Sequence, residues 1–393
     1  MVMAAIGAQT LITGCSSEAD DQMAELVDKD LAFAASQYTY FMKNIPAGEI
    51  PRSVDSAGQL LTCHGHDWTI GFYPGTLWYL YENTGDSSFK TAAEEKLKLI
   101  EPLMNYKGTH DLGFMMYCSF GNGYRLTQNP HYKAVLLTSA ASLSTRFNDT
   151  VGCIKSWNWK KGQFPVIIDN MMNLELLCWA SKNGGSPKYM QEAVSHANTT
   201  LKNHFRPDYS SYHVVLYDPH TGAVVKKQTH QGYADSSAWA RGQSWGLYGY
   251  TMMFDETHDS AYLTQARHIA GFLLNHPHMP EDLVPYWDYD APNIPNAERD
   301  VSAAAIMASA LIKLSTLTPD TAEEAQYKKA AEKVLVSLSQ PEYRYQEGEG
   351  QGFLLKHSVS SFPSGADVDR PLNYADYYFV EALMRYKNIF LHP

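Results

Sequence analysis

Basic residues are scarce in this chain of 393 residues, where 31 Lys and Arg face 42 Asp and Glu and leave a formal net charge of −11. No run of basic residues offsets this balance. Because affinity for nucleic acids depends on Lys and Arg side chains that neutralise phosphates, we expect no nucleic-acid partner.

Cysteine is also sparse, and none of the five cysteines shows the paired spacing of a zinc site. Cys118 and Cys178 lie within apolar helical patterns, so we expect them to be buried free thiols. Charged residues make up only 19% of the chain, whereas aromatic residues reach 12%. This composition fits a carbohydrate cleft lined by flat apolar rings, and it fits a bulky helical core equally well.

The first 15 residues are mostly apolar and end in Gly14-Cys15. A small residue before a Cys is typical of a bacterial lipoprotein signal, in which that Cys becomes lipidated. No Lys or Arg precedes the apolar run, and an ordinary N-terminal tail is the alternative. We predict a signal-like segment and linker over residues 1–23 and one catalytic domain over residues 24–393. A lipid anchor at Cys15 would be the only membrane contact, in the periplasm or at the outer membrane.

Apolar residues recur at helical spacing in twelve segments that alternate in character. Odd-numbered segments carry one apolar stripe and a charged face, whereas even-numbered segments are apolar or aromatic on most sides, as buried helices are. We predict an all-α fold, an (α/α)6 barrel of six inner and six outer helices. An α-solenoid would also alternate, but its repeats should share a signature. The segments are 24–43, 72–81, 89–104, 111–126, 130–147, 169–181, 187–204, 237–254, 261–275, 302–317, 321–339 and 374–386.

The inner segments each begin close to an aspartate. Parallel inner helices would bring their N-termini, and these carboxylates, to one mouth of the barrel. Asp is also a favoured N-cap residue, which is the simpler interpretation for any single one of them. Three stretches should lie at the same mouth: 157–166, the β-hairpin-like 212–225 and the Gly- and Ser-rich 348–371. The six aspartates are Asp67, Asp111, Asp169, Asp235, Asp300 and Asp376.

Asp169 and Asp111 have the neighbours expected of catalytic carboxyls. The apolar residues 166–168 precede Asp169, and desolvation there should raise its pKa, as a general acid near neutral pH requires. An N-cap held by backbone N–H groups would have its pKa lowered instead. Asp111 opens the preceding inner helix, so two neighbouring carboxylates could take the two roles of glycoside chemistry.

Arg241 is the only positive charge between Lys227 and Arg267. A lone Arg in an aromatic helix is costly to bury without a partner. It could pair with an aspartate of the barrel, or it could hold an anionic substrate through two parallel hydrogen bonds, and we favour the second. Trp239, Gln243 and, less closely, Trp245 lie on neighbouring turns near the start of the same helix.

These motifs resemble those of the unsaturated glucuronyl hydrolases, glycoside hydrolase family 88, over nearly the whole chain after the N-terminal segment. The resemblance implies an (α/α)6 barrel without metal or cofactor. It implies a substrate with a 4,5-unsaturated uronic acid at its non-reducing end, whose C4=C5 bond is hydrated so that the resulting hemiketal rearranges and expels the next sugar. The strongest strings are 110–114 (His-Asp-Leu-Gly-Phe), 167–170 (Ile-Ile-Asp-Asn), 229–233 (Thr-His-Gln-Gly-Tyr), 237–243 (Ser-Ala-Trp-Ala-Arg-Gly-Gln) and 373–378 (Asn-Tyr-Ala-Asp-Tyr-Tyr).

The resemblance also assigns roles to single residues. Asp169 matches the acid/base that protonates C4 and helps to activate water, and Asp111 matches a second essential carboxylate. Some members that act on sulfated disaccharides have Ser-x-x-Ser-x-Lys before the last helix; here Ser361 and Ser364 remain but Ala366 replaces Lys, which indicates less dependence on sulfate. Matches to substrate contacts and pocket lining are Arg241, Trp245, Trp239, His213, His230, Gln231, Thr229 and Trp68.

The predicted function is therefore removal of an unsaturated glucuronic acid from lyase-generated glycosaminoglycan oligosaccharides. A hydrolase of unsaturated rhamnogalacturonan would share the barrel and the chemistry. A polysaccharide lyase would create the double bond instead of consuming it, and a sugar-binding lipoprotein would bind without turnover. We expect an unsaturated oligosaccharide as the partner in each hydrolase case.

Overall fold

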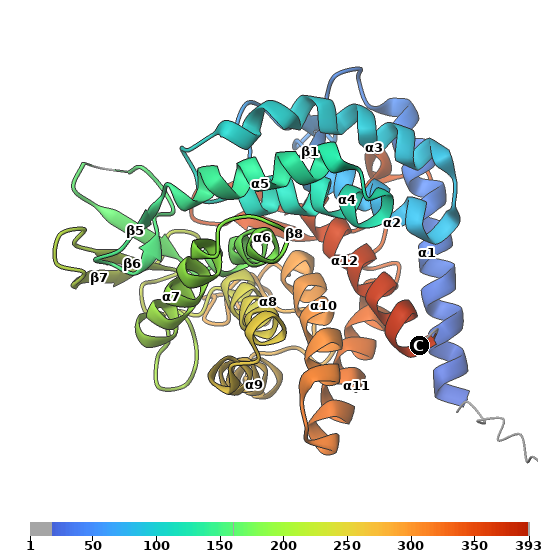
Figure 1. Cartoon of the computed structure of the whole chain (residues 1–393). Helices are drawn as coiled ribbons and strands as arrows, with labels where there is room; N and C mark the ends of the chain where they lie inside the picture. Colours follow the sequence, from blue (N-terminus) through green and yellow to red (C-terminus); the bar gives the residue numbers. More distant parts are fainter. Residues whose placement is uncertain (1–17, 160, 392–393) are drawn as a thin grey trace, which may run out of the picture.

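The computed structural model describes residues 18–159 and 161–391, and within these ranges the chain is mostly helical (Figure 1). Each of the twelve predicted segments coincides with helix, with bounds that move by a few residues. The helices are α1 (Glu18–Asn44), α2 (Phe72–Thr84), α3 (Ser87–Ile100), η1 (Glu101–Asn105), η2 (Gly113–Gly121), α4 (Asn122–Thr127), α5 (Pro130–Ser144), α6 (Asn170–Lys182), α7 (Lys188–Asn203), α8 (Ala240–Thr257), α9 (Ser260–Asn275), α10 (Val301–Leu317), α11 (Thr321–Leu338), η3 (Gly350–Gly352), α12 (Asn373–Tyr386) and η4 (Lys387–Leu391).

Six helices pack in a cycle, in which α2 contacts η2, then α6, α8, α10 and α12 follow, and α12 returns to α2. Each of the helices α1, α3, α5, α7, α9 and α11 contacts two successive members of this cycle from outside. The alternation read from the sequence is therefore an alternation of inner and outer position.

Burial follows the same division. Every residue of α8 from Ala240 to Met253 is buried, and α10 is buried from Val301 to Ile312. On α11, the buried residues form a stripe that includes Ala331, Val334 and Leu338, and the other face is charged. Over these ranges α8 and α10 consequently have no solvated face, which explains why their sequences are poor in charge.

The helix that follows Asp111 departs from an ordinary α-helix, since η2 is a π-helix. π-helical turns are rare and are often found at functional sites. Two glycines allow inner helices to approach closely here, because a Cβ on Gly113 would lie 2.5 Å from Asn173 Cα and one on Gly71 would lie 2.4 Å from Met115 O.

Short antiparallel strands occupy the connections at one end of the helices. The sheet β5–β6–β7 lies at the left edge in Figure 1, and the predicted stretches 157–166, 212–225 and 348–371 all contain strands. The hairpin β1–β2 was not predicted. The strands are β1 (Pro51–Val54), β2 (Leu60–Thr62), β3 (Phe147–Asn148), β4 (Cys153–Ile154), β5 (Phe164–Ile167), β6 (Val214–Tyr217), β7 (Val224–Gln228), β8 (Ser358–Ser361) and β9 (Ala366–Arg370).

The signal-like segment and Cys15 lie outside the described residues, whereas Glu18–Met23, predicted as part of a linker, belongs to α1. In the part of the chain that the structure describes, no helix is both long and apolar enough to cross a membrane. Cys118 and Cys178 are free thiols; Cys178 is buried, and Cys118 is partly accessible.

Candidate active site

The six aspartates near helix starts differ in how their carboxyls are held. Asp300 is an ordinary N-cap, since it accepts a hydrogen bond from Ser302 N, 3.1 Å away. Asp376 lies in the first turn of α12 and accepts hydrogen bonds from the backbone N–H groups of Leu354 and Leu355. Asp169 occupies the N-cap position of α6 without any side-chain cap hydrogen bond. The simple capping interpretation therefore applies to Asp300 and not to Asp169.

Asp67 and Asp235 complete the set. Asp67 lies before α2 and accepts from Thr69 N at 2.9 Å. Asp235 does not open its helix as predicted, because α8 begins only at Ala240. It lies in an exposed loop, where it accepts from Thr229 N and pairs with Lys226.

Strand pairing brings His213 to Asp169. β5 and β6 are antiparallel with Ile167 opposite Val214, and the ladder continues with a hydrogen bond of 3.0 Å from Ile168 N to His213 O. Since Asp169 follows Ile168, the two side chains emerge together, with His213 Nε2 3.7 Å from Asp169 Oδ2.

The protonation of His213 is fixed by its backbone partners. Its Nδ1 accepts hydrogen bonds from the backbone N–H groups of His230, at 3.2 Å, and Gln231, at 3.1 Å. Burial holds the pKa of His213 well below its usual value, so the ring is neutral and its single proton is on Nε2. His213 therefore presents an N–H donor toward Asp169.

The pKa of Asp169 is raised, as predicted. Burial raises the pKa of its carboxyl to about 7, against the lowering effect of Arg241, and the charge of Asp111 adds to the rise. The side chain is buried and its Oδ2 has no hydrogen-bond partner among the described residues. A buried carboxyl oxygen without a hydrogen-bond partner costs free energy, and a bound ligand could supply that partner. Asp169 is therefore a candidate proton donor to a ligand.

Asp111 reaches the same site from the turn just before η2. Its carboxyl accepts a short hydrogen bond from Thr109 Oγ1, and Oδ1 lies 3.2 Å from His110 Nε2. Gly113 lies in close contact with Asn173, and Phe114 N donates a hydrogen bond of 2.9 Å to Asn173 Oδ1. These contacts hold the start of η2 against the start of α6. The influence of Asp111 on the pKa of Asp169 follows from this approach.

Arg241 is completely buried, and the structure contains the ion pair that was the alternative prediction. Its Nη1 lies 2.9 Å from Asp300 Oδ2, and the guanidinium also donates to the carbonyls of Val359 and Ser360 on β8. The guanidinium lies 4.5 Å from the centroid of the Trp239 ring. Nε alone has no partner among the described residues. A direct grip of Arg241 on a substrate stays a prediction.

The predicted tryptophans lie around the carboxyls. Trp239 packs against His213 with ring centroids 4.4 Å apart, and Trp245 faces Asp169, where its indole N–H lowers the pKa of the carboxyl. Trp245 is buried beside Phe114, 5.1 Å between centroids, and Phe114 in turn packs against Trp68 at 5.3 Å. These rings form an aromatic floor and wall at the N-terminal ends of the inner helices.

A cavity of about 450 Å³ lies near this region, since the ring of His230 in its lining is 6.2 Å from that of His213. Four of its lining residues, His230, Gln231, Ser361 and Ser364, were predicted as site residues. Sequence reasoning placed Trp157 and Trp159 at the mouth but gave them no role; here their rings lie 5.2 and 5.4 Å from His230. The signal was present as two tryptophans in a short non-helical stretch. The lining is Trp157, Asn158, Trp159, His230, Gln231, Ser361 and Ser364.

Thr229 and Gln231 have structural partners of their own. Thr229 Oγ1 accepts from Gly232 N at 2.8 Å and so shapes the loop before α8. Gln231 Nε2 donates to Ser360 O at 2.9 Å, which ties that loop to β8.

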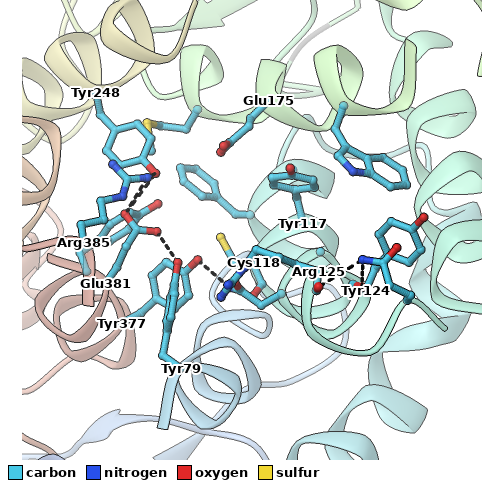
Figure 2. Close-up of a pocket in the computed structure, with 18 residues that line it drawn as sticks. Tyr79, Tyr117, Cys118, Tyr124, Arg125, Glu175, Tyr248, Tyr377, Glu381 and Arg385 are labelled. Atoms are coloured by element: carbon cyan, nitrogen blue, oxygen red, sulfur yellow. Dashed lines mark hydrogen bonds and ion pairs between the residues drawn. The ribbon is translucent and has the colours of Figure 1, made fainter. Parts of the chain in front are cut away.

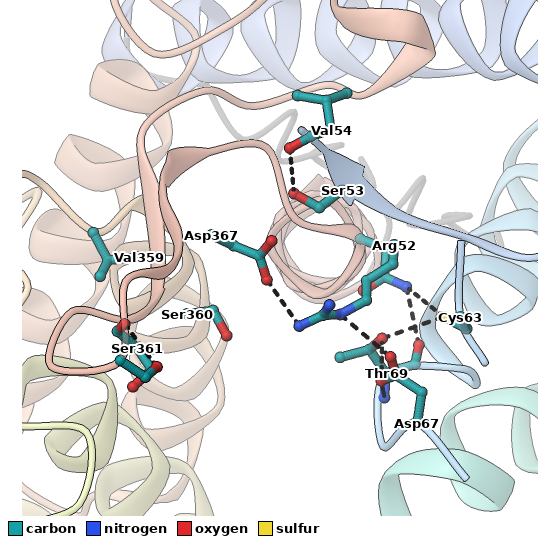
Figure 3. Close-up of polar contacts among 12 residues, drawn as sticks. Arg52, Ser53, Val54, Cys63, Asp67, Thr69, Val359, Ser360, Ser361 and Asp367 are labelled. Carbon is teal, nitrogen blue, oxygen red and sulfur yellow. Dashed lines mark hydrogen bonds and ion pairs between the residues drawn. The ribbon is translucent and has the colours of Figure 1, made fainter. Parts of the chain in front are cut away.

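Arg52 is a charged residue near the site that sequence reasoning missed. Figure 3 shows its guanidinium between Asp67 and Asp367, with Ser360 across the intervening space. Arg52 Nε lies 3.3 Å from Asp67 Oδ2, and Nη2 lies 2.8 Å from Asp367 Oδ2. Arg52 lies on β1 and Asp367 on β9, while Asp67 lies beside Trp68 in the loop before α2. The two ion pairs therefore link both strands to that loop. Within residues 18–159 and 161–391, no group of three His, Cys, Asp or Glu side chains is placed to hold a metal ion.

Comparison with known proteins gives a consistent result. The family model described as Glycosyl Hydrolase Family 88 matches residues 40–388. An unsaturated glucuronyl hydrolase of Formosa agariphila is 46% identical over 354 residues, which cover 88% of each chain.

Solved structures are also similar. A crystal structure of an unsaturated glucuronyl hydrolase specific for heparin superposes with a TM-score of 0.90 at 48% identity, covering 93% of this chain and 98% of the other. A mutant unsaturated glucuronyl hydrolase from Streptococcus agalactiae, complexed with dGlcA-GalNAc6S, superposes with a TM-score of 0.79 at 28% identity and covers 98% of both chains.

Proposed function

The chain belongs to Glycosyl Hydrolase Family 88, and we propose that it is an unsaturated glucuronyl hydrolase that acts on glycosaminoglycan-derived oligosaccharides. The cyclic packing of six inner and six outer helices supports the (α/α)6 barrel as its scaffold. The observation that carries the proposal is Asp169, a buried carboxyl with an unsatisfied oxygen and a pKa of about 7 beside the His213 N–H donor.

Asp169 begins the reaction as a carboxylic acid and transfers its proton to C4 of the unsaturated uronate. The C4=C5 electron pair forms the new C–H bond, and positive charge develops at C5 and on the ring oxygen. Water then attacks C5 and gives a proton to the Asp169 carboxylate, which restores the acid. The hemiketal formed at C5 rearranges and releases the next sugar.

The neighbours of Asp169 serve both protonation states. The burial of the site, and to a smaller extent the nearby Asp111, favour the protonated form of Asp169 at the start. Arg241 and the N–H groups of Trp245 and His213 favour the carboxylate that follows proton transfer. A pKa near neutrality suits a group that must both give and take a proton.

The cavity of about 450 Å³ lined by Trp157, Trp159 and His230 is the proposed site of the sugar that is released. Trp157, Trp159 and His230 offer flat faces to that sugar, and Ser361 and Ser364 offer hydroxyls. Ala366 lies opposite Ser361 in the β8–β9 hairpin, so no cation stands at this position to pair with a sulfate. Weak dependence on sulfation is the consequence, and Ala366→Lys should increase turnover of sulfated over unsulfated disaccharides.

Lipidation of Cys15, with a periplasmic or outer-membrane location, belongs to the same proposal. The supporting observation is the apolar segment that ends in Gly14-Cys15. Metabolic labelling with a fatty-acid probe in a bacterial host tests it: Cys15→Ser should remove the label, and a label that remains would contradict the anchor.

A panel of lyase-generated disaccharides of the heparin, chondroitin and hyaluronan types tests the activity. The absorbance of the unsaturated sugar should fall with time for at least one of them. A rise in absorbance with polymeric substrate would indicate a lyase, and saturable binding without an absorbance change would indicate a sugar-binding protein.

A further inference from the structure

A second cavity, of about 430 Å³, lies at the other end of the inner helices. Its walls include Tyr79 of α2, Trp179 of α6, Tyr248 of α8 and Arg385 of α12, which lie at or beyond the middle of their helices. Since a helix rises 1.5 Å per residue, Trp179 is roughly 15 Å farther along α6 than Asp169. The volume is within the range of small-molecule sites.

Aromatic rings separate this cavity from the catalytic carboxyls. Phe114 and Tyr378 line it, and both pack against Trp245, at 5.1 and 5.3 Å between centroids. These rings thus lie between the catalytic carboxyls and the second cavity. Neither Asp111 nor Asp169 lines that cavity.

Glu381 and the cations of the lining already have partners. Glu381 accepts hydrogen bonds from Tyr79, Tyr248 and Ser309 and lies 3.4 Å from Arg385 Nη2. Arg125, at the rim, donates two hydrogen bonds to Glu82. These groups hold the walls together and leave neither cation free.

Glu175 is different. Figure 2 shows its carboxyl extending from α6 into the space between Tyr248 and Tyr117, without a hydrogen bond to any residue drawn. Among the described residues, none forms a hydrogen bond or an ion pair with the Glu175 carboxyl. The cavity therefore contains one carboxyl group that has no partner in the described part of the chain.

Burial, more than any neighbouring charge, disfavours the ionisation of Glu175. Burial raises its pKa to about 8, and Glu381, Glu256 and Asp255 add to the rise while Arg385 opposes it. The last two acids have their own cations, Lys182 and Lys313, at 2.8 and 3.0 Å. The groups that face Glu175 from η2 are Tyr117 and Cys118, which bring no positive charge. When Glu175 loses its proton, no cation in contact with its carboxylate balances the negative charge.

Aromatic rings stand next to this carboxyl. Trp179 lies one helical turn beyond Glu175 on α6, and the rings of Tyr124 and Tyr117 lie 5.4 and 6.2 Å from that of Trp179. Aromatic faces attract cations, and aromatic walls are the usual means of recognising organic ammonium groups. A hard metal ion would instead need several oxygen ligands, and Glu175 is the single carboxylate available.

We propose that this cavity is a binding site for a small organic ammonium ion, with Glu175 as the counter-ion and Trp179, Tyr117 and Tyr124 as the aromatic wall. The unpartnered carboxyl, the cavity volume and the rings together carry the inference. The site is separate from the hydrolase chemistry and does not depend on it.

Choline is a suitable probe because its charge does not titrate, and 3,3-dimethylbutan-1-ol is its neutral isostere. Calorimetry on the full chain should show saturable binding of choline and roughly tenfold weaker binding of the alcohol. Affinity for choline should rise roughly tenfold between pH 6.5 and pH 8.5, because Glu175 must lose its proton to act as counter-ion. No saturable binding of choline, or equal affinity for the alcohol, would overturn the proposal.

Three variants locate the bound probe. Glu175→Gln should weaken choline binding roughly tenfold and remove its pH dependence, and Trp179→Leu, which keeps the carboxyl, should weaken it independently. Asp169→Asn should bind choline as the unmodified chain does, which separates this site from the catalytic mouth. Choline affinity that depends on Asp169 and not on Glu175 or Trp179 would place the probe in the active site and refute the proposal.

Discussion

Asp169, which is buried, and Glu175, which is half-buried, are two acids at the start and in the middle of one helix, and the environment of each determines what it can do. Both have a raised pKa, about 7 for Asp169 and about 8 for Glu175, and burial is the main cause for both. Asp169 stands among N–H donors that can stabilise its carboxylate after proton transfer. Glu175 lies among aromatic rings and other acids, with Arg385 as the opposing charge, and a bound cation would stabilise its carboxylate.

Asp376 extends the comparison. Burial raises its pKa to about 8 as well, yet its oxygens accept backbone N–H groups from Leu354 and Leu355 and a hydroxyl from Tyr38. It is a structural acid. A raised pKa alone therefore does not identify a catalytic group; what distinguishes Asp169 from Asp376 is an oxygen without a hydrogen-bond partner, close to N–H donors.

The largest expected effect is on turnover. Asp169→Asn keeps the shape of the side chain and removes its proton, so kcat should fall by at least ~10²-fold, the lower end of what a positioned acid/base supplies. Steady-state absorbance kinetics measure this, with Glu95→Gln on the exposed face of α3 as the matched control. Turnover retained by Asp169→Asn would remove this residue from the mechanism.

Arg241 tests whether charge near the mouth is structural. Arg241→Met would leave Asp300 buried without its cation, and breaking such a pair costs about 3–5 kcal/mol in the free energy of unfolding. Chemical denaturation should show this loss, and adding Asp300→Asn should restore part of it. An unchanged stability with a raised KM would instead show that the guanidinium serves mainly the substrate.

The pH dependence of the free energy of unfolding tests whether the pKa of Asp169 is raised in the folded chain. Its pKa is about 7 in the folded chain and near 3.8 in the unfolded chain, so its contribution to stability is full below pH 3.8 and is lost as pH rises through 7. Relative to the unmodified chain, Asp169→Asn should gain about 2 kcal/mol of stability between pH 5.5 and pH 8.5. A pH-independent difference would mean that this pKa is not raised.

The same titration sets the activity profile. Since the protonated carboxyl starts the reaction, kcat/KM should decrease as pH rises through about 7. In Asp111→Asn the residual activity should decrease at lower pH, because the charge that raises the pKa of Asp169 is absent. A descending limb that does not move would show that Asp111 acts in another way.

The smallest effect concerns the approach of η2 to α6. Gly113→Ala would force a Cβ against Asn173 and should cost about 1–3 kcal/mol of stability while it moves Asp111 away from Asp169. Gly271→Ala is the control, since nothing lies within 4 Å of its Cβ on α9, and it should stabilise the chain by about 0.5–1 kcal/mol. Equal stability of both variants would contradict the close approach.

Periodicity was enough to predict the helices, because burial on most sides leaves a sequence without a polar stripe. The apolar residues before Asp169 likewise predicted its raised pKa. Three features could not be predicted from the sequence. The π-helix of η2 looks like an ordinary helix in sequence, and the bonds of Arg241 to β8 join residues far apart in the chain. Glu175 is the only charged residue between Asp169 and Lys182, a signal that acquires meaning only once the cavity beside it is known.

The most direct test of the central claim compares an unsaturated disaccharide with its saturated counterpart of the same linkage. For the unsaturated one, loss of absorbance and release of the second sugar should proceed in equal amounts, and the saturated one should not be cleaved. Release of sugar from the saturated disaccharide at a comparable rate would mean direct attack at the anomeric carbon and would contradict hydration of the double bond by Asp169.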